Sequence, residues 1–411
     1  MKLSLFTKKV LAINFFSAII FNNLTAQNSE NTFQNIPLLD SLTIEKAVTY
    51  FQIDNANLNG EGADILKQHI ASSKFFVLGE NHYSNEISKL TKSLVPILDK
   101  SGYKAVAFEV GPLSAEKLKE LSEIPDSTQA RLKAFNGNYF NSSWGTSAIA
   151  FFNGVSDAAF LKAFAETDME IWGIDQELLF SVLFLGDDMV ESKSNDPNYE
   201  EIKAAWTKAK ETAEAEFEKM PRNVLNKIFT HPDFQQFEKM FDSDDIYAQE
   251  VLKRLYETKH IYESHHKIRV DYINSNFLSN YLAFEEEHQD ARYFIKIGAI
   301  HAATNTRSLG YYDVGALTQE IANAENAKST NVIIPRATYE GEDYRDVGAS
   351  LINFHKKDRW TLIDLEKLRN DLNSNKFQII THPEYRELSR TIKGFDLLLI
   401  PPADKKQVPN R

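Results

Sequence analysis

Four short apolar runs in this chain each lead into ionisable residues, and they constrain the fold more than any other feature. The runs, with the residues that follow them, are Phe75–Gly79 with Glu80 and His82, Ala105–Phe108 with Glu109, Ile171–Ile174 with Asp175, and Tyr293–Gly298 with His301. Short β-rich runs separated by helical stretches are typical of parallel strands. Because open parallel sheets bind ligands at the carboxyl ends of their strands, the ionisable residues are expected to converge there. Burying so many charged groups is costly unless a site uses them, so the pattern predicts an enzyme.

The chain as a whole predicts an α/β fold with a mostly parallel central sheet of about six strands flanked by helices. Two later apolar runs, Asn331–Pro335 and Phe395–Ile400, complete the six. Between Glu177 and Gln289 no convincing strand appears, and charged segments with helical apolar spacing predict a large helical insertion over residues 177–290. This insertion is expected to form either a lid over the pocket or an outer layer.

The 411 residues have room for one large domain or two ordinary ones. We expect a single catalytic α/β domain over residues 63–402. A polar segment, 27–62, precedes it and is expected to contain an amphipathic helix at Ile44–Phe51, and a tail, 403–411, follows it. Asn, Gly and aromatic residues crowd a stretch at 135–145, which predicts a loop that walls the site.

The first 26 residues have the pattern of a secretory signal peptide. Lys8 and Lys9 precede an apolar run, Val10–Phe21, and a small residue, Ala26, marks a cleavage site. An uncleaved membrane anchor is the alternative, but the run is shorter than the roughly 20 residues that a spanning helix needs. No other segment is long and apolar enough to span a bilayer. We therefore expect a bacterial protein, periplasmic or secreted, whose signal peptide, residues 1–26, is cleaved near Ala26.

The charge and the cysteine content narrow the chemistry and the partners. A net charge of -12 argues against nucleic acid or an anionic membrane as partner, although an acidic surface also serves solubility. The absence of cysteine excludes disulfides, a thiol nucleophile, thiolate metal ligands and a lipid-modified N-terminal cysteine. The aromatic stretch and the helical insertion suit a small, largely apolar substrate. The oligomeric state is left open.

Two of the strand ends carry the same spacing of glycine and histidine. Gly79 and His82 are separated by two residues, as are Gly298 and His301, and each pair closes an apolar run. A single GxxH motif arises by chance far more readily than two at strand ends. A histidine that titrates near neutrality suits acid–base catalysis, and a neutral imidazole equally suits a metal. The alternative for each histidine is a structural, hydrogen-bonded imidazole.

Other polar residues near these strand ends have both a functional and a structural interpretation. Glu109 follows four apolar residues and is expected in the crevice, unless it caps the helix predicted from Ser114. Glu86 lies one helical turn after the first GxxH histidine, where it either orients that imidazole or is an ordinary first-turn acid. Asp175 is more often a helix cap than a catalytic acid. His265–His266 lies on a charged helix and is expected to be solvated.

Together these residues resemble the superfamily that joins erythromycin esterases, Tiki-type and TraB-type metalloproteases, and iron-regulated haem-binding lipoproteins. The matching residues are Gly79-Glu80-Asn81-His82, Phe108-Glu109, Arg269 with Asp271 and Asn276, and Gly298-Ala299-Ile300-His301. Within the superfamily the erythromycin esterases fit best. That fit rests on His82 with Glu86, Trp172-Gly173-Ile174-Asp175, the spacing from Arg269 to Asn276, and the closing Phe395-Asp396-Leu397-Leu398-Leu399.

The resemblance implies an exported hydrolase with a hydrolase-type α/β domain that cleaves an ester or related acyl bond with activated water. His82 would take a proton from water held by Glu80 or Glu109, and His301 would protonate the leaving group or polarise the carbonyl. Arg269 would balance the carboxylates and stabilise the oxyanion. Either no cofactor is required or a divalent metal, Zn or Mn, is bound. The candidate metal ligands are Glu80, His82, Glu109 and His301.

Two departures from the esterase pattern keep other functions open. The esterases carry one more residue between the Glu and the His of the first motif, and they have a histidine where this chain has Gly298. The first alternative is a metal-dependent peptidase of the Tiki or TraB type. The second is a non-catalytic protein that binds haem or another ligand, although the haem-binding branch consists of lipoproteins and this chain has no cysteine to acylate. A third is an interaction protein whose helical insertion binds a partner.

Overall fold

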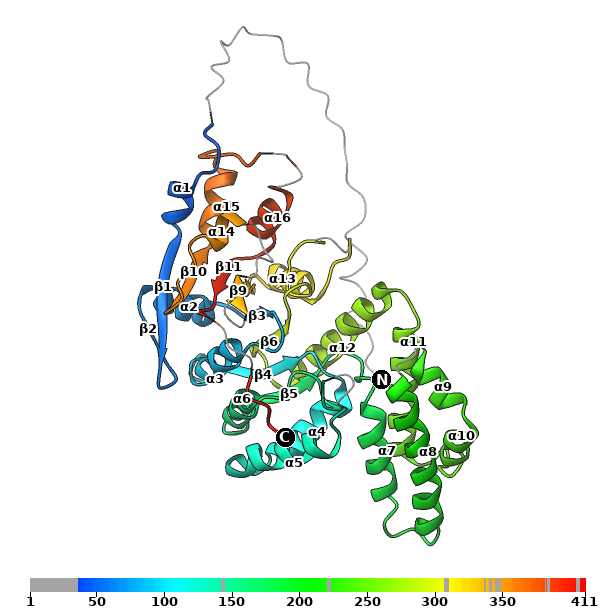
Figure 1. The fold of residues 1–411 in the computed structure, drawn as a ribbon. Helices are drawn as coiled ribbons and strands as arrows, with labels where there is room; N and C mark the ends of the chain where they lie inside the picture. The colour runs from blue at the N-terminus through cyan, green and yellow to red at the C-terminus, as the bar shows by residue number, and fades with distance from the viewer. Residues whose placement is uncertain are drawn as a thin grey trace, which may run out of the picture. The chain divides into compact units, whose positions relative to one another are not determined.

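The computed structural model describes residues 36–411, apart from 142–144, 220–222, 307–309, 336–337, 340–341, 344–348, 381, 383–384 and 404–406. Residues Pro37–Arg411 form one compact unit (Figure 1). The expected signal peptide, 1–26, lies outside the described residues. No helix in the described part of the chain has both the length and the apolar character needed to cross a membrane.

A sheet of nine strands, counted over the described residues, organises the fold. In spatial order the strands are β2 (Asn57–Asn59), β1 (Val48–Asp54), β10 (Trp360–Asp364), β11 (Leu397–Ile400), β7 (Ser329–Ile333), β3 (Phe75–Glu80), β6 (Arg292–Gly298), β4 (Tyr103–Phe108) and β5 (Glu170–Gly173). All neighbours from β11 to β5 are parallel, whereas β2, β1, β10 and β11 pair antiparallel. Two further short strands, β8 (Thr338–Tyr339) and β9 (Glu342–Asp343), pair with each other. The α/β class and the mostly parallel sheet are confirmed.

The expected number of about six strands is an undercount. The six parallel strands are the six that the apolar runs predict, and the three antiparallel strands were missed. Instead of a helix at Ile44–Phe51, a short α1 (Ser41–Glu45) is followed by β1. The apolar residues of this stretch have helical spacing, but Val48-Thr49-Tyr50-Phe51 is β-branched and aromatic, and these residue types favour a strand.

Each central strand is buried on both faces, so the sheet separates two hydrophobic cores. In β3, Phe76 and Leu78 pack into one core, while Phe75 and Val77 pack into the other. This alternation follows from the period of two along a strand, and it explains why such strands appear as continuous apolar runs. The carboxyl ends of the strands are thereby held rigidly at one edge of the sheet.

Helices contribute to both cores. The first contains residues of α2 (Glu61–Ser72), α3 (Asn85–Lys100), α4 (Pro112–Ser122), α5 (Thr128–Asn138) and α6 (Val155–Ala165), and also residues of helices between β5 and β6. A 3₁₀ turn, Pro125–Ser127, lies between α4 and α5 and has no buried residue. The second contains residues of α1, α12 (His266–Glu287), α13 (Val314–Ala324), α14 (Ala349–Ile352), α15 (Leu365–Asn373) and α16 (Arg386–Gly394). The expected wall loop at 135–145 is wrong in its first part, because α5 continues to Asn138; residues 142–144 lie outside the described part.

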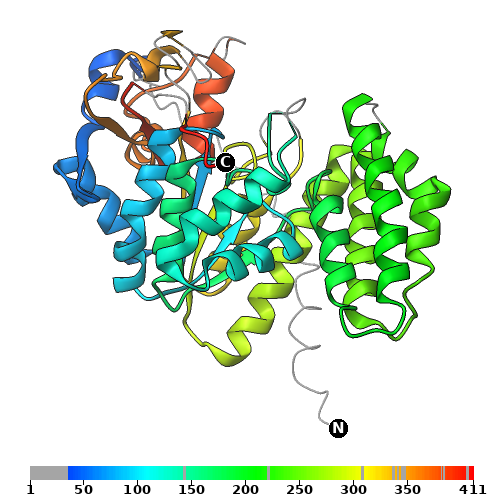
Figure 2. The same cartoon turned by 60° about the horizontal axis from the view of Figure 1, so that its bottom comes forward.

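Over its described residues, the chain between β5 and β6 consists of helices joined by turns and loops and contains no strand, as the sequence predicts. Its helices are α7 (Ser181–Glu191), α8 (Tyr199–Lys219), α9 (Val224–Thr230), α10 (Pro232–Glu238), α11 (Ile246–Tyr262) and α12. Figure 2 shows the green helices of this segment running side by side. Trp206, Phe217 and Phe237 are buried between them and belong to the first hydrophobic core.

Candidate active site

The carboxyl ends of four neighbouring parallel strands bring the expected residues together. Glu80 is the last residue of β3, Glu109 follows β4 directly, and Asp175 lies two residues after β5. His301 lies three residues after β6, on the strand between β3 and β4. All four side chains are buried, with at most 6% of each exposed. Their catalytic roles remain predictions.

Glu109 is the centre of the site. Its Oε1 accepts a hydrogen bond from Arg269 Nη2 at 2.8 Å, and its Oε2 accepts one from the Gly298 backbone N–H at 2.5 Å. The Nε2 atoms of His82 and His301 each lie 3.6 Å from this carboxylate. Burial raises the pKa of Glu109, but the two imidazoles and Arg269 outweigh it and hold the pKa below its usual range.

Glu80 joins His82 to a buried lysine. His82 Nδ1 lies 3.1 Å from Glu80 Oε1, and Lys296 Nζ lies 2.5 Å from Glu80 Oε2. Burial raises the pKa of Glu80, yet Lys296 and His82 overcome it and lower that pKa to about 2. Lys296 was missed from the sequence. The signal was a single lysine in the middle of an otherwise apolar strand, where an unpaired charge would be very costly.

His82 lies between two carboxylates, and this arrangement fixes its charge. Burial lowers its pKa, but Glu109 and Glu80 together raise it above the usual value and so favour the imidazolium form. Its side chain is 29% exposed. The ring of Phe151 stacks on it, with centroids 3.9 Å apart and an interplanar angle of 12°.

The backbone around His82 is strained at two aromatic residues. Tyr83 and Phe151 both have φ 64°, in the left-handed region that bulky side chains rarely adopt. Their rings lie 5.7 Å apart, and both lie near the imidazole of His82. Such strain persists where the surrounding structure holds it, and it concentrates at functional sites.

His301 is oriented by an aspartate that the sequence analysis missed. Its Nδ1 lies 2.6 Å from Asp313 Oδ2, and the histidine side chain is only 2% exposed. The other oxygen of Asp313 accepts the Val314 N–H at 2.8 Å and so caps α13. Burial lowers the pKa of His301, but Asp313 and Glu109 raise it above its usual value. The sequence feature that could have indicated this partner is an aspartate, Asp313, at the start of the helix that follows the GxxH motif.

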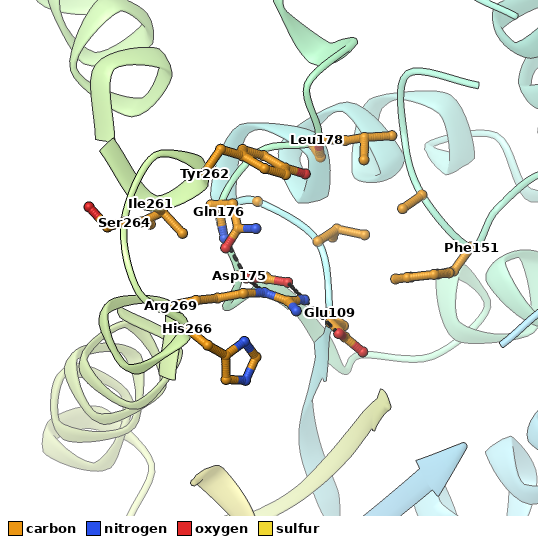
Figure 3. Close-up of a pocket in the computed structure, with 14 residues that line it drawn as sticks. Glu109, Phe151, Asp175, Gln176, Leu178, Ile261, Tyr262, Ser264, His266 and Arg269 are labelled. Carbon is orange, nitrogen blue, oxygen red and sulfur yellow. Dashed lines mark hydrogen bonds and ion pairs between the residues drawn. The ribbon is translucent and has the colours of Figure 1, made fainter. Parts of the chain in front are cut away.

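Arg269 on α12 ties the insertion to the strand ends. Its Nε donates to Asp175 Oδ1 at 3.1 Å and its Nη2 to Asp175 Oδ2 at 2.5 Å, a bidentate pair (Figure 3). Burial raises the pKa of Asp175, and Arg269 offsets only part of that. Asp175 is therefore an ion-pair partner and does not cap a helix, because the next helix, α7, begins only at Ser181. Asn276, about two turns further along α12, donates to the Ile174 carbonyl at 3.2 Å.

A cavity of about 390 Å³ opens beside this network. Its lining residues are Glu109, Val110, Gly111, Ser114, Ala150, Phe151, Asp175, Gln176, Leu178, Ile261, Tyr262, Ser264, His266 and Arg269 (Figure 3). The lining comes from the ends of β4 and β5, from the loop that carries Phe151, and from α11 and α12. His266, expected to be solvated, is thus part of the cavity wall. The insertion contributes directly to the site.

Glu86 and Glu177 also occupy defined places near the site. Glu86 accepts hydrogen bonds from Asn85 and Lys89, both on its own helix. Glu177, which the sequence analysis passed over, is fully buried and accepts hydrogen bonds from the backbone N–H groups of Leu113 and Ser114. It therefore caps α4, which begins at Pro112, so neither Glu109 nor Ser114 performs that role.

We expect Glu177 to make stability depend on pH. Burial raises its pKa from 4.5 to about 7, so the folded protein keeps a proton that the unfolded chain has released. Its contribution to the free energy of unfolding therefore falls as pH rises from about 4.5 to 7. In Glu177→Gln that loss should be absent, which urea unfolding on either side of this pH range measures. The exposed Glu123→Gln is the control, and an unchanged pH slope in Glu177→Gln would contradict the assignment.

Gly298 stands at a point of close approach. A Cβ built there would lie 3.0 Å from His82 Nε2 and 3.2 Å from Glu109 Oε2. A side chain at this position would therefore crowd the His82 imidazole.

The four candidate metal ligands do not fit a metal as they are arranged. Glu80 is paired with the ammonium group of Lys296, and Glu109 with the guanidinium of Arg269. Two fixed cations already neutralise the carboxylates that a divalent ion would need. Over the described residues, no group of three or more His, Cys, Asp or Glu side chains is arranged to hold a metal ion.

Comparisons with known proteins show the fold. No protein-family model matches the sequence, and comparison with curated proteins gives no match. Among solved structures, a mutant of the erythromycin esterase EreC in its open conformation is 13% identical with a TM-score of 0.51, covering 88% of this chain and 98% of its own. A Bacillus cereus protein is 11% identical with a TM-score of 0.51, and the match covers 91% of this chain and 100% of that protein. A succinoglycan biosynthesis protein is 14% identical with a TM-score of 0.50, and the match covers 90% of this chain and 97% of that protein. The expected resemblance to erythromycin esterases is confirmed at the level of the fold.

Proposed function

We propose that this protein is a hydrolase that cleaves an ester or related acyl bond by attack of water. The observation that carries the proposal is the continuous network of ionisable side chains at the edge of a cavity. It runs from Asp313 through His301, Glu109 and His82 to Glu80. The fold shared with an erythromycin esterase supports the same reaction class.

The geometry supports an acid role for the two buried imidazoles. Each faces carboxylates with both ring nitrogens, and this favours the protonated ring with two N–H groups. We assign the transfer of a proton to the leaving alkoxide to His82, which is the more exposed of the two. This differs from the base role expected for His82 from the sequence.

Arg269 is the group best placed to stabilise the oxyanion. A guanidinium has five N–H donors, and the ion pairs with Asp175 and Glu109 use those on Nε and Nη2. The Nη1 donors of this cavity-lining residue can therefore bind the developing negative charge. Such preorganised donors act most strongly away from water.

The cavity also supports the expected substrate class, a small and largely apolar molecule. Val110, Phe151, Leu178 and Ile261 provide apolar walls around the charged edge. The signal-like segment 1–26 supports export to the periplasm or the medium, and the net charge of -12 argues against nucleic acid as a partner.

Hydrolysis of p-nitrophenyl butyrate tests the proposal. The protein should turn this ester over. With an alkyl ester such as ethyl butyrate, whose leaving alkoxide needs a proton, His82→Ala should lower kcat by at least about 100-fold, the lower range for a positioned acid. His260→Ala on the exposed face of α11 is the matched control and should keep full activity. Equal activity in His82→Ala would contradict the assignment. Absence of turnover together with a Soret band on haem titration would favour the ligand-binding alternative.

A further inference from the structure

Three imidazoles meet at this site, and they differ in what surrounds them. His82 and His301 are each held between carboxylates, as described above. His266, the first residue of α12, is exposed and lines the cavity beside Arg269 (Figure 3). Its ring stacks on that of His301, with centroids 5.9 Å apart and an interplanar angle of 28°. It is the imidazole of the three that opens directly on the space where a substrate would lie.

We propose that His266 is the general base, the residue that accepts the proton of the attacking water. The inference rests on the proposed ester hydrolysis and deepens it. A base must present an unprotonated nitrogen within reach of the water. His82 and His301 point their nitrogens at carboxylates, and His301 is only 2% exposed. His266 meets both requirements from the cavity wall.

The charges around His266 agree with this role. Burial lowers its pKa, and the neighbouring His301 on the loop after β6 and Arg269 on α12 lower it further. Asp313 and Asp175 oppose this more weakly, so the pKa stays below the usual value and the ring is neutral near pH 7. The same site thus holds two imidazoles with a raised pKa and one with a lowered pKa, as acid–base catalysis by an acid and a separate base requires.

The reaction balances with these groups alone. A water oxygen forms a bond to the carbonyl carbon while one of its protons passes to a nitrogen of His266. The carbonyl electron pair moves to oxygen, where Arg269 stabilises it. The bond from carbon to the leaving oxygen then breaks, and that oxygen takes a proton from His82. The products are a carboxylic acid and an alcohol, and the proton on His266 returns to His82 through solvent.

The neighbouring His265 provides a matched control. It is also exposed and is the N-cap residue of α12, one position from His266. With p-nitrophenyl butyrate, His266→Asn should lower kcat by about 100-fold with little change in KM, and the acid limb of the pH profile should disappear. His265→Asn should stay within about 2-fold of the parent, because its ring does not line the cavity. Added imidazole should restore part of the activity of His266→Asn. Wild-type activity and pH profile in His266→Asn would overturn the inference.

A second measurement does not depend on turnover. Diethyl pyrocarbonate acylates neutral, accessible imidazoles, and mass spectrometry reports the extent at each histidine. At a pH of about 6.5, the ordinary pKa of histidine, His266 should be labelled faster than His82 and His301. Phenylphosphonate, a mimic of the tetrahedral oxyanion, should protect His266 but not His265. If no ester is hydrolysed, the proposed reaction fails, yet fast and protectable labelling still supports His266 as the substrate-facing imidazole. Labelling of His266 slower than that of His82 and His301 overturns the inference.

Discussion

Replacing Glu109 with glutamine is expected to lower ester turnover by about 1,000-fold, within the range for acid–base groups. Glu109 faces His82, His301 and Arg269 at once, so the loss of its charge affects three groups. Without it, the pKa values of both imidazoles fall, because each loses one of its two carboxylate neighbours, and Arg269 loses one of the two carboxylates that orient it. Steady-state kinetics on p-nitrophenyl butyrate measure the effect.

The same variant should remain folded. Both imidazoles can release their protons, and Arg269 keeps its bidentate pair with Asp175, so no uncompensated charge is left buried. Circular dichroism and thermal unfolding check this. Glu116→Gln, which removes an exposed partner of Lys119 on α4, is the control for activity. Retention of more than a tenth of the activity in Glu109→Gln would show that this carboxylate is structural.

Replacing Lys296 with methionine is expected to produce the largest loss of stability. Lys296 and Glu80 are 5% and 6% exposed and pair at 2.5 Å, and removal of one partner of a buried pair costs about 3–5 kcal/mol because the other charge stays buried. Urea unfolding near neutral pH measures this. The more exposed pair of Lys89 and Glu86 provides the control, since Lys89→Met should change the free energy of unfolding very little.

A second substitution separates charge from packing. In Lys296→Met the buried Glu80 keeps only His82 as a partner. Adding Glu80→Gln removes this poorly compensated charge, so the double variant should regain part of the lost stability. The pair should also show in the pH dependence of the parent protein. The pKa of Glu80 is lowered to about 2, so its stabilisation is present above the unfolded value near 4.5 and is lost as pH falls towards 2. A double variant no more stable than Lys296→Met would attribute the loss to packing.

The sequence predicts the parallel half of the sheet because each of its strands is recognisable locally. A strand such as Phe75–Glu80 is buried on both faces and is therefore apolar at nearly every position. The antiparallel strands are different. In β1 only Phe51 is fully buried, so the strand has no continuous apolar run that would identify it. Its partner β10 lies near the other end of the chain, so sequence proximity does not predict the pairing either.

The residues of the candidate site can likewise be predicted from the sequence only in part. Residues at strand ends, such as Glu109 and His301, are found from their position after an apolar run. The groups that set their charges come from elsewhere: Asp313 begins a helix, and Lys296 lies inside a strand. His266 shows the limit most clearly, because only the packing of α12 against the strand ends distinguishes it from His265. A local pattern identifies the carboxyl end of a strand, whereas the partners across the crevice depend on tertiary structure.

The strand order has a consequence for the synthesis of this protein. β3 pairs with β6 and β7, which begin only at Arg292 and Ser329. At about 5–20 residues per second, roughly 10–50 seconds separate the emergence of β3 from that of its second neighbour. For that interval the apolar strand at the centre of the sheet has no partner to cover its edges, and such edges are sites of aggregation. We therefore expect aggregation to compete with folding until Ile333 has emerged. Expression together with a holdase chaperone should raise the soluble yield of the protein.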